Sequence, residues 1–136
     1  QAVSLAKQNA ALNNIDMMFL QSDWFEVFNN NENTQLFDLI VSNPPYVEAN
    51  SPYLQQGDLR FEPLTALASG DDGLDDIRHI VKQSVKYLSQ NGYLIIEHGS
   101  KQAEQVQILY KENGFTNIKT MHDLNNLPRI TLGSLL

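Results

Sequence analysis

Cysteine is absent from this chain of 136 residues, and its absence removes several kinds of chemistry at once. Disulfide bonds, thiolate zinc sites and cysteine nucleophiles are all excluded, and nothing in the sequence points to an oxidising compartment. Basic residues are also scarce: 9 stand against 16 acidic residues, which gives a formal net charge of −7. Because nucleic-acid binders depend on attraction to phosphate, this charge disfavours DNA or RNA as a substrate.

Long apolar runs and leader-like segments are missing as well. No stretch is long and apolar enough to span a bilayer, and neither a signal peptide nor a low-complexity tract is recognisable. We therefore expect a cytoplasmic protein that has no membrane partner. With 42% hydrophobic residues, a chain of 136 residues is long enough for one domain with a substantial core.

The most informative stretch is Phe37–Tyr46, FDLIVSNPPY, in which an apolar run stops at an asparagine followed by two prolines and an aromatic residue. The nearly continuous run is typical of a strand that is covered on both faces within a parallel sheet. Pro44 and Pro45 lack backbone N–H groups and push the preceding residue toward extended geometry, so the strand must end at Asn43 in a rigid turn. Asn43 is thereby predicted at the carboxyl end of a strand, where open α/β sheets bind their ligands.

Helix and strand patterns alternate around this stretch, which predicts an α/β fold with right-handed crossovers. Helices are expected at 1–14, 75–88 and 102–113, strands at 15–20, 37–42, 92–99, 117–121 and 129–135, and a long ordered loop at 47–73. The final two strands have no helix between them, so we expect them to be antiparallel.

The corner at Asn43 and Pro44 offers two hydrogen-bond acceptors side by side, the asparagine side-chain oxygen and the proline carbonyl. Two acceptors suit an NH₂ group, which is a poor nucleophile when its lone pair is delocalised. Accepting both hydrogens orients the group and raises the electron density on its nitrogen. Asn-Pro is also a common turn starter, but the buried run before it and Tyr46 after it favour the functional interpretation.

This corner resembles the [DNS]-P-P-[YFW] motif of the class I S-adenosylmethionine-dependent methyltransferases that modify amino nitrogens. SNPPYV, followed by LQQGDLRFEPLTAL, GYLIIEHG and PRITLG, is similar to the HemK-type release-factor glutamine methyltransferases, from Ala2 to the C-terminus. The resemblance implies a Rossmann-like sheet, mostly parallel with an antiparallel C-terminal strand. It also implies methyl transfer from S-adenosylmethionine, without a metal, to the side-chain amide nitrogen of the glutamine in the Gly-Gly-Gln motif of peptide-chain release factors.

The resemblance also assigns roles within the corner. Asn43 and Pro44 would be the catalytic pair, since Asn43 Oδ1 and the Pro44 carbonyl would bind the glutamine amide. Pro45 and Tyr46 would complete the substrate site, with the Tyr46 ring packed beside the amide, and Asn43 would also contact the cofactor.

Asp23 and Trp24, after the expected strand at 15–20, match the pair that contacts adenine in this family. A carboxylate can accept the adenine amino hydrogens, and an indole can cover the ring. Taken without the family, the same two residues are better explained as a capping aspartate and a core tryptophan.

The family's glycine-rich cofactor loop, its ribose-binding acidic residue and its N-terminal helical domain would all precede Gln1. We therefore expect residues 1–136 to be the C-terminal part of a single catalytic domain, truncated at its N-terminal side. In the family's sheet, two strands lie between those that match 15–20 and 37–42, and both of these intervening strands would be absent here. We expect the isolated chain either to borrow strand pairing from another chain or to belong to a longer polypeptide.

Two other functions remain open from the residues alone. One is an amino-methyltransferase acting on adenine or guanine in DNA or RNA, which would want a basic surface. The other is an inactive fragment that lacks its cofactor loop.

Several further side chains are candidates for lesser roles. Arg60 and Glu62, in the long loop, would either pair to hold it shut or contact the protein substrate. Glu97 and His98 end a predicted strand in the ligand crevice, so a substrate contact there is open. The histidines lack metal-ligand spacing and are expected to be ordinary: His79, His98 and His122.

Overall fold

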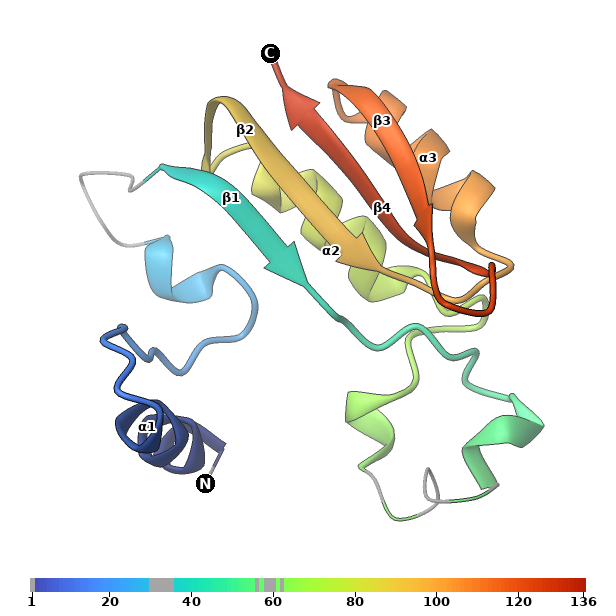
Figure 1. The fold of residues 1–136 in the computed structure, drawn as a ribbon. Helices are drawn as coiled ribbons and strands as arrows, with labels where there is room; N and C mark the ends of the chain where they lie inside the picture. Colours follow the sequence, from blue (N-terminus) through green and yellow to red (C-terminus); the bar gives the residue numbers. More distant parts are fainter. Residues whose placement is uncertain (1, 30–35, 56, 58–60, 62) are drawn as a thin grey trace. The chain divides into compact units, whose positions relative to one another are not determined.

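The chain folds as two units, Gln1–Gln35 and Leu36–Leu136, in this computed structural model. Residues 2–29, 36–55, 57, 61 and 63–136 are described. Among them, the first unit contains helix α1 (Ala2–Leu12) and the 3₁₀ helix η1 (Glu26–Phe28), and the second contains the sheet and two further α-helices (Figure 1).

The sheet has four strands in the order β1-β2-β4-β3. Their bounds are β1 Phe37–Ser42, β2 Leu88–Glu97, β3 Phe115–His122 and β4 Pro128–Leu135. β1 and β2 are parallel, whereas β4 runs antiparallel to both β2 and β3. The α/β class and the antiparallel C-terminal strand are therefore confirmed. Within the described residues the sheet is mixed, with one parallel and two antiparallel pairings.

Two helices cover one face of the sheet, α2 (Asp75–Ser84) and α3 (Ala103–Glu112), and both lie behind the strands in Figure 1. Ile77 and Val81 of α2 are fully buried, as the helical spacing of the apolar residues predicts. Leu94 and Ile96 of β2 are also fully buried, because alternate side chains of a strand point to the same face. The core of this unit therefore lies between the helices and the sheet.

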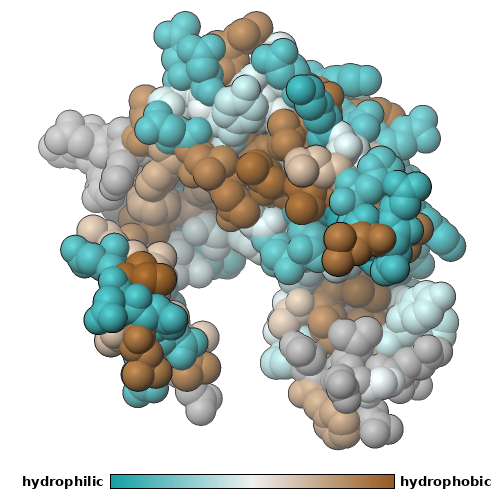
Figure 2. All heavy atoms as spheres, viewed as in Figure 1, coloured by the Kyte–Doolittle hydropathy of each residue, from teal (hydrophilic) through white to brown (hydrophobic). Residues whose placement is uncertain are grey.

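The opposite face of the sheet is open and apolar. Leu39 and Val41 of β1 are 52% and 66% exposed, and Tyr93, which pairs with Leu39 in β2, is 41% exposed. Figure 2 shows apolar side chains gathered over the strands on this face. The prediction that the β1 run is covered on both faces is therefore wrong for the unit Leu36–Leu136, because α2 and α3 both pack on the other side.

The strand expected at 15–20 is also not found. These residues follow α1 and the turn at Asn14, whose φ is 53°, but they do not form a strand. A strand needs a neighbour that accepts and donates its backbone hydrogen bonds. No strand occurs among the described residues of the unit Gln1–Gln35, so 15–20 has no strand partner among them.

The start of β2 differs from the prediction for a local reason. The expected helix at 75–88 ends at Ser84, and β2 begins at Leu88 instead of Gly92. The predicted turn at Asn91 persists as a bulge with φ 63°, because the pairing jumps from Phe37↔Leu88 to Leu39↔Tyr93. The long connection at 47–73 is confirmed, and its described residues include two short 3₁₀ helices, Pro52–Gln55 and Leu64–Ala66.

Candidate active site at the carboxyl end of β1

The corner Asn43–Tyr46 follows β1 directly, since the strand ends at Ser42. Asn43 is exposed, Pro44 is buried and Tyr46 is half-buried. A cavity of about 340 Å³ opens beside the corner, lined by Asn43, Pro44, Pro45, Tyr46, Val47, Ala66 and Leu67. The prediction that Asn43 stands at a strand's carboxyl end is confirmed, and the cavity gives a side chain room to approach the corner.

Tyr46 is held through its hydroxyl group. The hydroxyl donates a hydrogen bond of 3.0 Å to Glu97 Oε1, at the end of the neighbouring strand β2. Burial, together with this bond and the nearby carboxylate, raises the pKa of Tyr46 above its ordinary value. Tyr46 therefore keeps its proton and its orientation at neutral pH, and Glu97 acts as the partner that fixes it.

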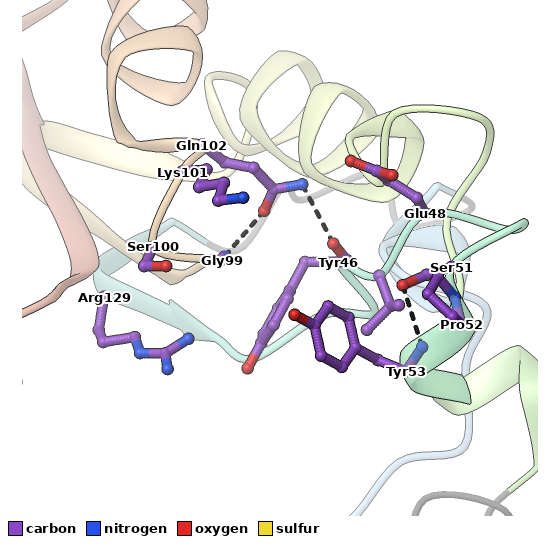
Figure 3. A pocket seen from close by; sticks show the side chains of 11 residues that line it. Tyr46, Glu48, Ser51, Pro52, Tyr53, Gly99, Ser100, Lys101, Gln102 and Arg129 are labelled. Atoms are coloured by element: carbon purple, nitrogen blue, oxygen red, sulfur yellow. Dashed lines mark hydrogen bonds between the residues drawn. The ribbon is translucent and has the colours of Figure 1, made fainter. Parts of the chain in front are cut away.

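A larger cavity of about 560 Å³ lies next to the corner and shares Tyr46 and Val47 with the smaller one. Figure 3 shows the side chains that surround it. Its walls come from the start of the long loop, the turn after β2 and the start of β4: Tyr46, Val47, Glu48, Ser51, Pro52, Tyr53, Gly99, Ser100, Lys101, Gln102 and Arg129. Lys101 and Arg129 bring positive charge to this side, and Arg129 Nε donates to Asp123 Oδ2 at 3.1 Å.

His98 takes no part in either cavity. Its side chain is fully buried, with Nδ1 2.9 Å from the Gly99 carbonyl oxygen and Nε2 2.9 Å from Thr131 Oγ1. Since only a protonated Nδ1 can donate to a carbonyl, Nε2 of the neutral ring accepts from the threonine hydroxyl. Burial lowers the pKa of His98, and the nearby charge of Arg129 acts in the same direction. The possible substrate contact by His98 is therefore excluded, because the ring has no exposed surface.

The other two histidines, His79 and His122, are exposed. Within the described ranges, no group of three or more His, Cys, Asp or Glu side chains could hold a metal ion. Arg60 and Glu62, for which loop closure or a substrate contact was considered, lie outside the described residues.

Gln102 is the residue that the sequence patterns missed. It precedes α3 and is only 9% exposed. Its side-chain nitrogen donates to the backbone carbonyls of Tyr46 and Asp72, and its side-chain oxygen accepts from the Gly99 N–H. Periodicity does not single out such a glutamine, because all three of its partners lie in irregular backbone outside the helix that it begins.

Asp23 and Trp24, the predicted adenine pair, belong to the unit Gln1–Gln35. Asp23 is exposed and lines a cavity of about 680 Å³ together with Gln21, Ser22, Glu26 and Val27. Trp24 is half-buried and has a positive φ of 46°. A bulky residue in that region is an outlier of the kind that clusters at functional sites. Asn43 belongs to the other unit. The predicted adenine contacts and the predicted acceptor corner are therefore each described within a separate unit.

The fold is shared with solved methyltransferases. A methyltransferase from Pyrococcus furiosus matches with a TM-score of 0.64 at 14% sequence identity, covering 97% of this chain and 56% of that one. A family model described as the methyltransferase small domain matches residues 1–56. The chain thus has a fold that is found in solved methyltransferases.

Sequence relatives are more specific. The release factor glutamine methyltransferase of Pasteurella multocida (strain Pm70) is 47% identical over 133 residues, which are 98% of this chain and 44% of that protein. The enzyme of the same name from Haemophilus influenzae is 46% identical over 131 residues, which are 96% of this chain and 43% of that protein. The chain is therefore homologous, along nearly its whole length, to the release factor glutamine methyltransferases. It spans less than half the length of these relatives.

Proposed function

We propose that the protein transfers a methyl group from S-adenosylmethionine to a glutamine side-chain amide in the Gly-Gly-Gln motif of a peptide-chain release factor. The observation that carries this proposal is the corner Asn43–Tyr46, which ends a strand beside a cavity of about 340 Å³ with Asn43 exposed. The names of the relatives support the choice of substrate. Translation termination would place the reaction in the cytoplasm.

Asn43 and Pro44 would act on the glutamine amide directly. Asn43 Oδ1 and the Pro44 carbonyl oxygen would each accept one of the two amide hydrogens, which orients the nitrogen and raises its electron density. Tyr46, anchored to Glu97 at 3.0 Å, would pack against the amide plane. On transfer, the new nitrogen–carbon bond would replace the methyl–sulfur bond of S-adenosylmethionine, whose electron pair would stay on the sulfur, and the nitrogen would release its extra proton to water.

Asp23 and Trp24 fit the adenine end of S-adenosylmethionine by their chemistry. The exposed Asp23 carboxylate borders a cavity of about 680 Å³ and can accept amino hydrogens, and the Trp24 indole can cover a flat ring. When bound, S-adenosylmethionine supplies a methyl carbon that its sulfonium makes electrophilic. Neither a metal ion nor a protein nucleophile is needed in this scheme.

The charge of the chain argues against the alternative acceptor, an amino group of a nucleic-acid base. With a formal net charge of −7, the chain lacks the excess of positive charge that sequence-independent phosphate contacts require. A protein acceptor makes no such demand.

Radiolabelled methyl transfer by the intact protein tests the proposal. Label should pass to a release factor, and it should be lost when Gly-Gly-Gln is changed to Gly-Gly-Ala in that factor. Duplex DNA serves as the second acceptor in a parallel reaction. Label on the DNA, or equal label on both forms of the release factor, would contradict the proposal.

A further inference from the structure

We infer that Gln102 is a positioning residue for the acceptor corner, acting through one side-chain amide that holds three backbone segments together. Gln102 Nε2 donates to the carbonyl oxygens of Tyr46 at 3.1 Å and Asp72 at 3.0 Å, and Gln102 Oε1 accepts from the N–H of Gly99 at 2.8 Å. Figure 3 shows this amide between Gly99 and Tyr46. The inference rests on the proposed function, because it concerns how that corner is held in place.

The two carbonyls that Gln102 binds stand at opposite ends of the long connection. Tyr46 closes the corner and Asp72 precedes α2, so the two N–H groups of one amide draw both ends of the 47–73 loop to the same point. The NH₂ group of a glutamine carries two N–H donors, so it can donate to two carbonyls at once. Backbone bonds from Val47 N to the Leu67 oxygen at 2.9 Å and from Ser69 N to the Val47 oxygen at 3.0 Å complete the closure.

Gly73 shows how closely this amide is packed. Its φ of +72° lies in the region that side chains disfavour, and a Cβ there would lie 2.3 Å from the Tyr46 oxygen and 2.7 Å from Gln102 Nε2. Any side chain at position 73 would therefore push the Tyr46 carbonyl and the Gln102 amide out of place.

Tyr46 is consequently fixed at two places, its carbonyl by Gln102 and its hydroxyl by Glu97. The corner begins on the other side at Ser42, which pairs with Ile96 in the sheet. The acceptors of Asn43 and Pro44 thus lie on a short segment that is held at both ends. Because a displacement of about 1 Å at a reacting centre can cost about a hundredfold in rate, losing one of these anchors should lower turnover.

Gln102→Glu in the intact protein removes the two donated hydrogen bonds while it keeps the size of the side chain. The carboxylate keeps the size of the side chain and still accepts from Gly99, but it has no N–H to offer the Tyr46 and Asp72 carbonyls. We expect kcat for release-factor methylation to fall by roughly ten- to a hundredfold, with the Kd for S-adenosylmethionine unchanged. Gln105→Glu, on the exposed side of α3, adds the same charge and should leave kcat as it is.

Gly73→Ala disturbs the same hydrogen bond by placing a methyl group against the Tyr46 carbonyl and the Gln102 amide. Gly114→Ala is its matched control. Gly114 has a positive φ of +86°, but no atom lies within 4 Å of the place that a Cβ would take, so its substitution adds backbone strain without a clash. Both alanine variants should unfold at lower temperature than the wild type. Only Gly73→Ala should lower kcat when both are assayed well below their unfolding temperatures.

Amide hydrogen exchange decides the positioning role even without an assay of activity. Exchange at Val47 and Ser69 should quicken in Gln102→Glu and Gly73→Ala but not in Gln105→Glu or Gly114→Ala. Wild-type exchange and wild-type kcat in Gln102→Glu would overturn the role of Gln102, whatever becomes of Gly73→Ala. A wild-type protein that methylates no release factor would instead count against the proposed function. The exchange data would still show whether Gln102 holds the Tyr46 and Asp72 segments in place.

Discussion

Asn43 and Pro44 are placed by local rules that can be applied to the sequence alone. Two prolines in succession cannot continue a strand, so the position of the corner follows from covalent geometry. The partners that hold the corner do not follow from such rules. Glu97 lies 51 positions from Tyr46 and Gln102 lies 56 positions away, and contacts of that range depend on the assembled sheet.

His98 illustrates the same limit. A Glu-His pair at a strand end indicates a possible substrate contact, but the ring is enclosed by β4, whose Thr131 hydroxyl meets Nε2 at 2.9 Å. Thr131 Oγ1 is also 3.0 Å from Thr120 Oγ1, to which Gln107 donates at 2.8 Å. A donor chain that starts from the Gln107 amide ends with the threonine hydroxyl donating to His98, which suits a neutral ring.

This arrangement predicts a pH dependence of stability. Because burial lowers the pKa of His98 in the folded state, the unfolded chain binds a proton more readily. The free energy of unfolding should therefore decrease as pH falls below about 6.5, the ordinary value that the unfolded chain regains. Urea unfolding at neutral and mildly acidic pH measures the decrease.

Two histidine variants test the origin of that pH dependence. His98→Gln should remove much of the decrease, since a glutamine does not titrate. His79→Gln, at an exposed position of α2, should retain it. Equal slopes in both variants would show that the decrease comes from other groups.

At the scale of elements, signals that lie within a single helix, such as its apolar spacing and its terminal glycine, predict the structure well. The helical spacing in 77–81 places α2 on the sheet, and Gly114, with a φ of +86°, ends α3 as a C-terminal glycine should. The strand predicted at 15–20 depends on a neighbour, and an apolar run cannot reveal whether that neighbour exists. The early start of β2 depends on a bulge at Asn91, which the sequence shows only as a turn signal.

Helix α3 is attached to the sheet by a buried hydroxyl, which gives a second prediction. Tyr110 is fully buried and its hydroxyl donates to the Thr131 carbonyl at 3.1 Å. Tyr110→Phe should lower the free energy of unfolding by about 1 kcal/mol, the usual worth of such a bond. Tyr93→Phe, on the open face, should change it little, and urea unfolding compares the two. A larger loss in Tyr93→Phe would contradict the assigned packing.

At the scale of the whole molecule, the sequence does not reveal that one face of the sheet in the unit Leu36–Leu136 is left uncovered. The sequence shows a nearly continuous apolar run in β1, but which face of the strand is covered depends on where the helices pack. Exposed apolar strands at a sheet edge tend to associate with other chains. Among the described residues β1 pairs only with β2, so its other edge has no strand beside it within this unit.

We therefore predict that residues 1–136, expressed alone, associate with one another in solution. Sedimentation should show species heavier than the chain mass of 15.4 kDa. Leu39→Lys with Val41→Lys places two charges on the open face and should shift the distribution toward the monomer. A chain that is monomeric and well folded without these substitutions would contradict the prediction that it needs further pairing.

We propose that Asn43 and Pro44 hold the glutamine amide at the corner for methyl transfer. Single-turnover methylation of a release factor by the intact protein, wild type against Asn43→Ala, measures it directly. Loss of one preorganised acceptor should slow the methyl-transfer step by about a hundredfold while the Kd for the release factor changes little. An Asn43→Ala variant that transfers methyl groups to the Gly-Gly-Gln glutamine at the wild-type rate would show that Asn43 does not hold the amide.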